Sequence, residues 1–271
     1  MAVKRLLKLL ISLLLHGWDL VGGLFRKLSG RESPASCVVL YYHAVADQQR
    51  GEFARQMDLL LRLAKPISAN HQTPLASGQR YAAVTFDDGF VSVIQNALPE
   101  LQDRSIPATI FVPTGSLGRS PLWITDPGSP SRKETVLSAE ELKGLRGTNL
   151  LTIGSHSVNH PNFLKSEPAQ ARAELVESKS TLEQILGSEV VLFSFPHGAH
   201  NEPLLQQAKE AGYRRVFTIE PTPAFRRTNE FAIGRTLVDP SDWSPEFRLK
   251  LLGAYRWLAP VSAWKARRLR N

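Results

Sequence analysis

Short apolar runs alternate with longer amphipathic stretches from residue 37 to residue 257. The short runs are rich in β-branched and aromatic residues, and they predict strands at residues 37–43, 81–86, 108–112, 150–154, 190–195, 214–219 and 231–237. The longer stretches predict helices at residues 52–64, 91–104, 138–145, 168–186, 203–211 and 245–257. Several strand runs are apolar almost throughout, which is typical of strands covered on both faces. This alternation predicts an α/β fold with a parallel sheet, either open or closed into a barrel.

Residues at the helix ends support these boundaries. Ser138 is followed three residues later by Glu141, which is the sequence of a capping box. Gly187 and Gly212 follow two predicted helices, where a glycine commonly ends a helix. Residues 115–132 are rich in Gly, Pro and Ser and predict a long loop over one face of the domain, of a kind that often serves function.

The first 28 residues follow a different pattern. Polar residues recur in steps of three and four, and nearly all the others are apolar, so a helix here has a broad apolar face and a narrow basic one. Such a helix is typical of the membrane interface. The polar stripe consists of Lys4, Lys8, Ser12, His16, Asp19, Gly23 and the pair Arg26 and Lys27.

Two other interpretations of this segment stay open. A transmembrane span would bury Lys8, or both His16 and Asp19, in hydrocarbon, which is costly. A signal peptide would use Lys4 and Arg5 as its basic region, although no small-residue cleavage site follows closely. We therefore divide the chain into an interfacial helix and linker (1–32), a folded domain (33–258) and a basic tail (259–271).

Composition and charge narrow the class of protein. Hydrophobic residues make up 42% and charged residues 21%, as in soluble globular proteins. The single cysteine, Cys37, excludes an internal disulfide and lies in an apolar run that predicts an inert core thiol. The net charge of +8 belongs to the two ends, because residues 1–31 hold six basic residues against Asp19 and residues 248–271 hold seven and no acid.

This charge distribution favours an anionic membrane surface as a partner over nucleic acid. Basic residues interleaved with aromatics across the folded part would indicate nucleic-acid binding, and that pattern is missing from the sequence. Lys and Arg near an anionic bilayer gain roughly 1 kcal/mol each. The tail, with Trp257 and Trp264 before Lys265, Arg267, Arg268 and Arg270, predicts a second bilayer contact.

Two carboxylates follow the predicted strand 81–86. Asp87 and Asp88 stand where parallel strands of α/β folds end, which is where such folds bind ligands. Adjacent carboxylates repel each other, so the pair requires a cation or a proton to hold it. Asp-Asp-Gly is also good turn chemistry, so a purely structural role stays open at this point.

Two histidines follow another predicted strand, residues 150–154. His156 and His160 are four residues apart and are able to direct both imidazoles at one cation. One carboxylate and two imidazoles with open coordination positions suit a divalent catalytic ion, which polarises a carbonyl and activates water. A third strand ends at Phe195-Pro196-His197-Gly198.

Together these three elements resemble the polysaccharide deacetylase superfamily, the NodB homology domain of the fourth carbohydrate esterase family. Residues 85–89 (TFDDG) are similar to its first motif, residues 155–160 (SHSVNH) to its second and residues 193–198 (FSFPHG) to its third. Residues 40–43 (LYYH) and the helix before the third motif also resemble the family, over about residues 37–255.

The resemblance implies an incomplete (β/α) barrel. It also implies a divalent metal ion, zinc by preference, held by Asp88, His156 and His160, with Asp87 as the general base that activates the attacking water. The oxyanion would be stabilised at the turn of Pro196, His197 and Gly198.

The sequence departs from the family pattern in three places. Many members carry Arg two residues before the proline of the third motif, where it orients the base, and this chain has Ser194. Many supply a late histidine as general acid, but no histidine follows His200, so His43 and His197 are the candidates. Residues 239–243 (DPSDW) look like the fourth motif but follow the last predicted strand, and we interpret that match as coincidental.

We therefore expect a metal-dependent hydrolase that removes the N-acetyl group from an acetylated amino sugar of a glycan. Because of the basic ends, we expect the glycan to be membrane-presented or lipid-linked and the enzyme to lie at a bacterial inner membrane. Deformylation, O-acetyl ester hydrolysis and an inactive membrane-bound scaffold remain alternatives. The sequence leaves open which sugar is the substrate, which side of the membrane is used and the oligomeric state.

Overall fold

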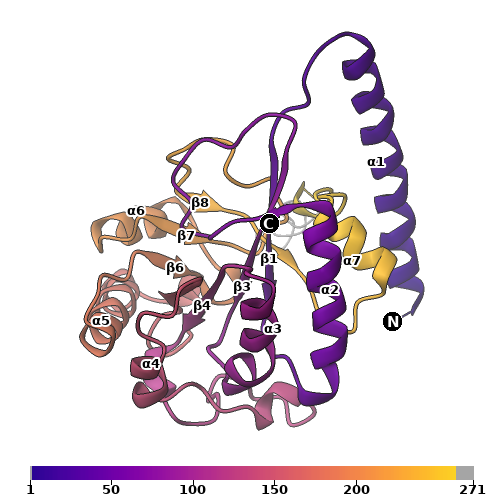
Figure 1. Ribbon diagram of the computed structural model, residues 1–271. Coiled ribbons are helices and arrows are strands. Elements are labelled where there is room, and N and C mark those ends of the chain that lie inside the picture. The colour runs from indigo at the N-terminus through magenta and orange to yellow at the C-terminus, as the bar shows by residue number, and fades with distance from the viewer. Residues whose placement is uncertain (1, 261–271) are drawn as a thin grey trace.

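The computed structural model describes residues 2–260, so the part of the predicted basic tail from residue 261 onward lies outside the described residues. Parallel strands form one curved sheet with helices outside it (Figure 1). In the order of the sheet, the strands are β8 (Ala232–Ile233), β7 (Arg215–Phe217), β6 (Leu192–Ser194), β5 (Leu151–Ser155), β4 (Ala108–Val112), β3 (Arg80–Phe86), β1 (Ser36–Tyr42) and β9 (Thr236–Leu237). A two-residue strand, β2 (Lys65–Pro66), also pairs with β3.

The two ends of this sheet are formed by neighbouring parts of the chain. β8 pairs with β7 at one edge and β9 pairs with β1 at the other, although only Gly234 and Arg235 separate them in sequence. The predicted single strand 231–237 is therefore wrong. The chain has to leave one edge and reach the other within two residues, and this crossing brings the edges together as an incomplete barrel.

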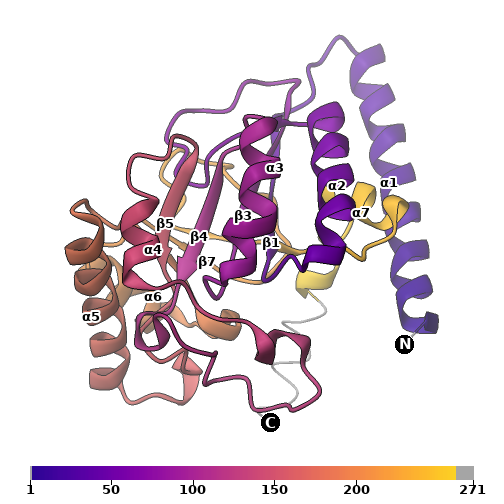
Figure 2. The same ribbon diagram turned by 60° about the horizontal axis from the view of Figure 1, so that its bottom comes forward.

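Helices cover the outside of the sheet (Figures 1 and 2). They are α1 (Ala2–Leu28), α2 (Arg50–Leu63), α3 (Leu98–Asp103), α4 (Ala139–Gly144), α5 (Pro168–Leu186), α6 (Glu202–Glu210) and α7 (Ser244–Leu251). A π-helical turn, Val93–Ala97, precedes α3, and short 3-10 turns lie at Asp47–Gln49, Thr114–Ser116, Pro130–Lys133, Phe163–Lys165 and Pro196–Gly198. The predicted capping box is confirmed, since Glu141 N–H donates to Ser138 Oγ and Ser138 N–H donates to Glu141.

The helix expected at residues 91–104 is confirmed over residues 91–103. Its Val93–Ala97 part is π-helical, just before Pro99, which has no N–H for a regular α-helical hydrogen bond. Another predicted helix was too long. The helix expected at residues 245–257 ends at Leu251, because Gly253 adopts a positive φ of 72° that reverses the chain.

Successive residues of each strand point to opposite sides of the sheet, which creates two apolar clusters. Val38, Leu40 and Tyr42 of β1 pack under the outer helices, while Cys37 and Val39 belong to a smaller cluster on the other face. Cys37 is buried, and burial raises the pKa of its thiol well above the ordinary range, as expected of an inert core thiol. The apolar surroundings of the inner face make any charge placed there costly unless it is paired.

Gly154 offers a test of how closely the sheet is packed. A Cβ atom at this position of β5 would lie 2.5 Å from two ring atoms of Phe111. We predict that Gly154→Ala lowers the free energy of unfolding by about 1–3 kcal/mol in urea denaturation. Gly144→Ala, at an open position of α4 with no atom within 4 Å, is the control and should leave stability unchanged or slightly higher. Equal effects would contradict the packing described here.

Candidate metal centre

Three strands deliver the polar residues to one edge of the sheet. Asp87 and Asp88 follow β3, His156 and His160 lie in the loop after β5, and His197 lies in the turn after β6. The strands are parallel and adjacent in the order β3, β4, β5, β6, so their carboxyl ends meet at the same edge. The structure thus brings together the ligand set that the sequence predicts, and all three of its members are buried.

The geometry of Asp88, His156 and His160 fits one cation. Their ligand atoms all lie within 4.8 Å of one another, and Asp88 Oδ1 is 3.3 Å from His160 Nε2 and 3.6 Å from His156 Nε2. Among the described residues, Asp88 Oδ1 is a buried atom without a hydrogen-bond partner. A buried carboxylate oxygen without a donor, facing two imidazole nitrogens, is the donor set of a divalent ion with open coordination positions.

His156 is prepared for this role by its second ring nitrogen. Its Nδ1 lies 2.7 Å from the Ser194 carbonyl oxygen, which fixes Nδ1 as the donor and leaves Nε2 as the free ligand atom. Burial lowers the pKa of His156 to about 4, against the opposing effect of the nearby Asp87 carboxylate. The imidazole is therefore neutral at neutral pH, as a metal ligand must be.

Glu174 of α5 holds the loop that carries both histidines. Its buried carboxylate accepts hydrogen bonds from the backbone N–H groups of Val158 and Asn159, both at 2.8 Å, and from the Asn159 side chain at 2.7 Å. Glu174 was not among the site residues predicted from the sequence. The sequence feature that could have identified it is an acidic residue on the helix face that buries Ala171, Leu175 and Ser178.

The site also concentrates unusual backbone conformations. Asp88, Ser157, His160 and His197 are non-glycine residues with φ between 54° and 70°. Such conformations cost about 1–3 kcal/mol each and persist only where the surroundings hold them. Here Ser157 Oγ accepts from the His160 N–H at 3.0 Å, and Ser155 Oγ accepts from the Ser157 N–H.

Asp87 is held by Arg235, a partner the sequence analysis missed. Arg235 donates from Nη1 to Asp87 Oδ1 at 2.8 Å and from Nη2 to Asp87 Oδ2 at 2.7 Å, a bidentate pair with both side chains buried. Burial alone would raise the pKa of the Asp87 carboxyl, but the adjacent Arg235 guanidinium holds that pKa well below its usual range. Asp87 is therefore ionised.

Arg235 occupies the crossing between β8 and β9, inside the incomplete barrel. It also donates to Ser194 Oγ at 2.7 Å and from Nε to the Thr218 carbonyl at 3.1 Å. Ser194 is the position at which many members of the resembled family carry the arginine that orients the base. In this chain the guanidinium of Arg235, which lies between β8 and β9, contacts Ser194 instead. The signal in the sequence was a single charge within an otherwise apolar predicted strand, which has to be paired if it is buried.

The remaining predicted residues lie around this centre. The ring of His197 is 4.7 Å from that of His160, and burial and His160 lower its pKa although its side chain stays accessible. His43 follows β1, with its ring 5.7 Å from that of Tyr41. Gly198 N–H donates to the Phe195 carbonyl at 2.9 Å within the turn that begins at Pro196.

The predicted loop 115–132 contributes one side chain to the site. The Trp123 ring stacks on the ring of His160, with centroids 4.6 Å apart and an angle of 19° between the planes. Sequence reasoning did not single out Trp123. Its side chain supports one face of a metal ligand and places the loop at the entrance of the site.

The fold is a parallel half-barrel, and its site holds an Asp-His-His set that fits a divalent metal ion. The polysaccharide deacetylase family model matches residues 76–216, and the chain belongs to this family. This confirms the family resemblance, and the solved relatives confirm the half-barrel fold with an added N-terminal helix.

Individual relatives are distant. YxkH of Bacillus subtilis is 26% identical over 220 residues, which is 77% of this chain and 74% of that protein. The poly-beta-1,6-N-acetyl-D-glucosamine N-deacetylase of Staphylococcus aureus is 26% identical over 168 residues, covering 59% of this chain and 55% of the relative. The structure of IcaB from Ammonifex degensii superposes with a TM-score of 0.69 at 25% identity, covering 81% of this chain and 98% of IcaB.

Removing Glu174's charge should loosen the metal ligands. We predict that Glu174→Gln lowers zinc affinity about 10–100-fold, because an amide has a single acceptor oxygen and cannot accept from both the loop backbone and the Asn159 side chain. Isothermal titration calorimetry on metal-stripped protein measures this. Glu177→Gln on the exposed side of the same helix is the control and should bind zinc as the parent does.

Breaking the Asp87–Arg235 pair should produce a pH-dependent loss of stability. We predict that Arg235→Met lowers the free energy of unfolding by about 3–5 kcal/mol at neutral pH, because Asp87 becomes a buried unpaired carboxylate. Burial then raises its pKa, so the folded variant takes up a proton more readily than the unfolded chain as the pH falls. The stability deficit of the variant should therefore shrink as the pH falls from about 7 to about 5. The stabilisation that the Asp87–Arg235 pair gives the parent stays constant over this range, because the carboxyl of the unfolded chain titrates only at about 3.9.

Arg215→Met is the matched control for this experiment. Arg215 is buried but donates to the Ala69 and Glu230 carbonyl groups rather than to a carboxylate. Its variant should lose stability without the recovery at lower pH. If Arg235→Met shows a constant deficit across this range, the account of Asp87 is wrong.

Proposed function

We propose that this protein is a zinc-dependent N-deacetylase that releases acetate from an N-acetylated amino sugar of a glycan. The observation that supports this most strongly is the division of two adjacent carboxylates between two partners. Asp88 faces two imidazole nitrogens, and Asp87 faces a guanidinium. Asp88 is thereby placed to bind a cation, while Asp87 is kept ionised and able to accept a proton.

In this proposal Asp88, His156 and His160 hold the zinc ion. When bound, the ion supplies Lewis-acid polarisation of the amide carbonyl and lowers the pKa of water. Asp87 acts as the general base, because Arg235 keeps it ionised and fixes both of its oxygens. The burial of Asp87, Asp88 and His156 keeps bulk water from screening these charges.

The turn Pro196–Gly198 is proposed to face the reacting carbonyl. Because the Gly198 N–H is already used within the turn, the backbone N–H of His197 is the proposed donor to the oxyanion. The leaving amine requires a proton, and the two candidates for its donor are the side chains of His197 and His43. His197 is the better candidate because it is accessible and lies beside His160.

The proposed substrate rests on the relatives and on the N-terminal segment. The Staphylococcus aureus relative is named for a β-1,6-linked N-acetylglucosamine polymer, and we extend that substrate class to this chain. We propose in addition that the glycan is presented at a bacterial inner membrane or linked to a lipid, because a long apolar helix precedes the domain.

Activity and metal content should separate the roles of the two carboxylates. We predict that the zinc-loaded parent releases acetate from β-1,6-linked N-acetylglucosamine oligomers. Asp87→Asn should keep zinc and lose about 10²–10⁴-fold in kcat, while Asp88→Ala should lose both zinc and activity. Acetate release and elemental analysis of the same samples measure both quantities.

The outcomes of this assay also distinguish the alternatives. Release of formate from an N-formyl sugar, or of acetate only from an O-acetyl ester, would replace the proposed reaction. A parent that binds zinc and acts on none of these substrates would support the inactive scaffold. Zinc retained by Asp88→Ala would contradict the ligand set.

The two histidines should differ in how they affect the reaction. If His197 donates the proton, His197→Ala should lower kcat about 10²–10⁴-fold with little change in zinc affinity, and His43→Ala should have a smaller effect. An assay with an acetyl ester that has a good leaving alcohol tests proton donation directly. Such a leaving group needs no proton, so the His197→Ala variant should recover most of the lost rate on this substrate. The opposite ranking of the two variants would assign the role to His43.

A further inference from the structure

The middle of the polar stripe of α1 faces the protein, whereas Lys4, Lys8, Arg26 and Lys27 at its two ends are exposed. Ser12, His16 and Asp19 of the stripe are half-buried or buried, and so are Arg5 and Leu9 beside it; these five residues recur in steps of four and three. α1 lies alongside α7 in both views of the molecule (Figures 1 and 2). The middle of the stripe that the sequence predicted to be hydrophilic is therefore used for contacts with the domain.

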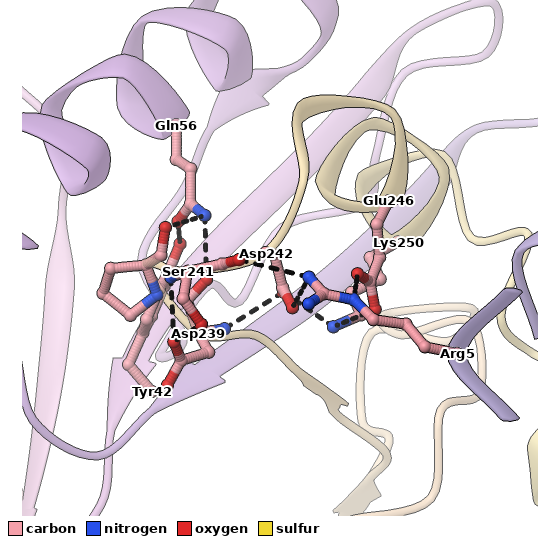
Figure 3. A network of polar contacts seen from close by, with 9 residues as sticks. Arg5, Tyr42, Gln56, Asp239, Ser241, Asp242, Glu246 and Lys250 are labelled. Carbon is pink, nitrogen blue, oxygen red and sulfur yellow. Dashed lines mark hydrogen bonds and ion pairs between the residues drawn. The ribbon is translucent and has the colours of Figure 1, made fainter. Parts of the chain in front are cut away.

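These contacts are specific at both ends of this docked face. Arg5 donates from Nε to Glu246 at 2.6 Å and from Nη2 to the Ser241 carbonyl at 3.1 Å (Figure 3). Asp19 accepts two hydrogen bonds from Arg256, at 2.7 and 2.8 Å. Between them, Trp257, a predicted interfacial residue, donates from its indole to the fully buried Ser12 at 3.0 Å.

The opposite face of α1 is apolar and exposed. Trp18 and Leu14 are each 76% exposed, and other large apolar side chains of the helix are exposed in the same way: Val3, Leu6, Leu7, Leu10, Leu13, Leu20, Val21, Leu24, Phe25 and Leu28. A helix on a water-soluble protein has the reverse arrangement, with its apolar face inward. An apolar surface of this extent marks a site that something else covers.

The basic residues around the apolar face of α1 favour an anionic bilayer as the partner that covers it. Lys4 and Lys8 are exposed near the start of the helix, and Arg26 and Lys27 are exposed at its last turn. A groove of about 1110 Å³ under the C-terminal half of α1 has more basic than acidic residues in its lining. The basic residues are Arg26, Lys27, Arg31, Arg80 and Arg256, and the acidic ones are Asp19 and Glu32. An apolar face flanked by cations is the arrangement that buries into the acyl region and attracts anionic headgroups.

The contacts of the stripe favour a helix in the plane of the bilayer over a span. α1 has the length and apolar character of a possible membrane span, but Arg5 and Asp19 lie 14 positions apart along it. At 1.5 Å per residue, this separates the two ionic contacts by about 21 Å. A spanning helix would have to give up these contacts or bring α7 into hydrocarbon with it.

We propose that α1 lies in the surface of an anionic bilayer with its apolar face inserted, while the middle of its polar stripe stays docked on α7. In this arrangement the helix fixes the orientation of the domain relative to the bilayer, which a flexible tether would not do. This builds on the membrane presentation proposed above, but it does not depend on the deacetylase chemistry.

This docking places the metal centre relative to the bilayer. Arg5 contacts the segment after β9, next to the carboxyl ends of the strands. In the same network, Gln56 donates to the Asp239 carbonyl at 2.8 Å and accepts from Tyr42, the last residue of β1 (Figure 3). The start of α1 is thus level with the edge that carries the site. A bilayer that covers α1 would therefore lie beside this edge of the sheet.

Vesicle binding tests the inserted face. We expect the full chain to cosediment with vesicles of phosphatidylglycerol and phosphatidylethanolamine, and less with pure phosphatidylcholine. Leu14→Glu and Trp18→Glu should each weaken binding at least about 10-fold, because each places a charge at the inserted surface. Val176→Glu, at an exposed apolar residue of α5 on the side of the molecule away from α1 (Figure 1), is the control and should bind as the parent does.

Other results would overturn the proposal. Equal vesicle binding by all variants would show that the apolar face of α1 does not insert into the bilayer. A dimer in light scattering that Leu14→Glu dissociates would show that a second copy of the chain covers this face. Resistance to alkaline extraction would indicate a span, and a cellular protein that lacks α1 by intact mass would indicate a signal peptide. Acetate release from soluble oligomers, measured in parallel, separates failure of the anchor from failure of the proposed reaction.

Docking of the stripe needs a separate measurement. In the double variant Arg5→Ala and Asp19→Ala we expect vesicle binding within about two-fold of the parent, because the inserted face is intact. Cleavage by trypsin at Arg31, in the linker between α1 and β1, should become at least about 10-fold faster on vesicles, since the linker is no longer held at both ends. Unchanged cleavage would show that α1 acts only as a tether.

Discussion

The buried pair of Asp87 and Arg235 ties the crossing between the two edges of the sheet to the end of an inner strand, and it sets the charge of the candidate site. Arg235 stands where the chain crosses from β8 to β9, and Asp87 stands at the end of β3. A guanidinium in this apolar interior requires a carboxylate, and a carboxylate beside Asp88 requires a cation. Each charge is therefore tolerable only because the fold brings the other to it, so the closure of the sheet and the ionisation of Asp87 depend on the same contact.

The rest of the site follows from this division. With Asp87 neutralised by Arg235, Asp88 is left to face His156 and His160. The histidine loop is in turn held by Glu174 and by serine hydroxyls that satisfy its N–H groups in strained conformations. Ser194 connects the two halves, because its carbonyl orients His156 while its hydroxyl accepts from Arg235.

Local sequence patterns predicted much of this. The strand ends at Asp87, His156 and Pro196 follow from apolar periodicity and motif spacing, and the site residues they carry converge as expected. The partner of Asp87 could not be predicted in this way, because Arg235 lies 148 positions away and reaches Asp87 only through closure of the sheet. The same closure explains why residues 231–237, one strand by pattern, form two strands on opposite edges. Glu174 was missed for a related reason: an acidic residue on a buried helix stripe indicates a polar partner, but the backbone N–H groups it binds cannot be identified from the side-chain pattern.

The N-terminal helix shows a further limit of periodicity. The spacing of its polar residues predicted the helix and its two faces, but the pattern alone does not say what each face contacts. The contacts of Arg5 and Asp19 assign the middle of the polar stripe to the domain and leave the apolar face outward. The folded part and the helix thus share one organising feature, which is that charged side chains far apart in sequence are paired across the fold.

Anomalous diffraction from crystals of the zinc-loaded protein, recorded at the zinc absorption edge, tests the division of the two carboxylates most directly. The account predicts one strong peak in contact with Asp88, His156 and His160, with Asp87 still paired to Arg235. A peak bridging Asp87 and Asp88 with Arg235 displaced, or a peak elsewhere in the molecule, would contradict it.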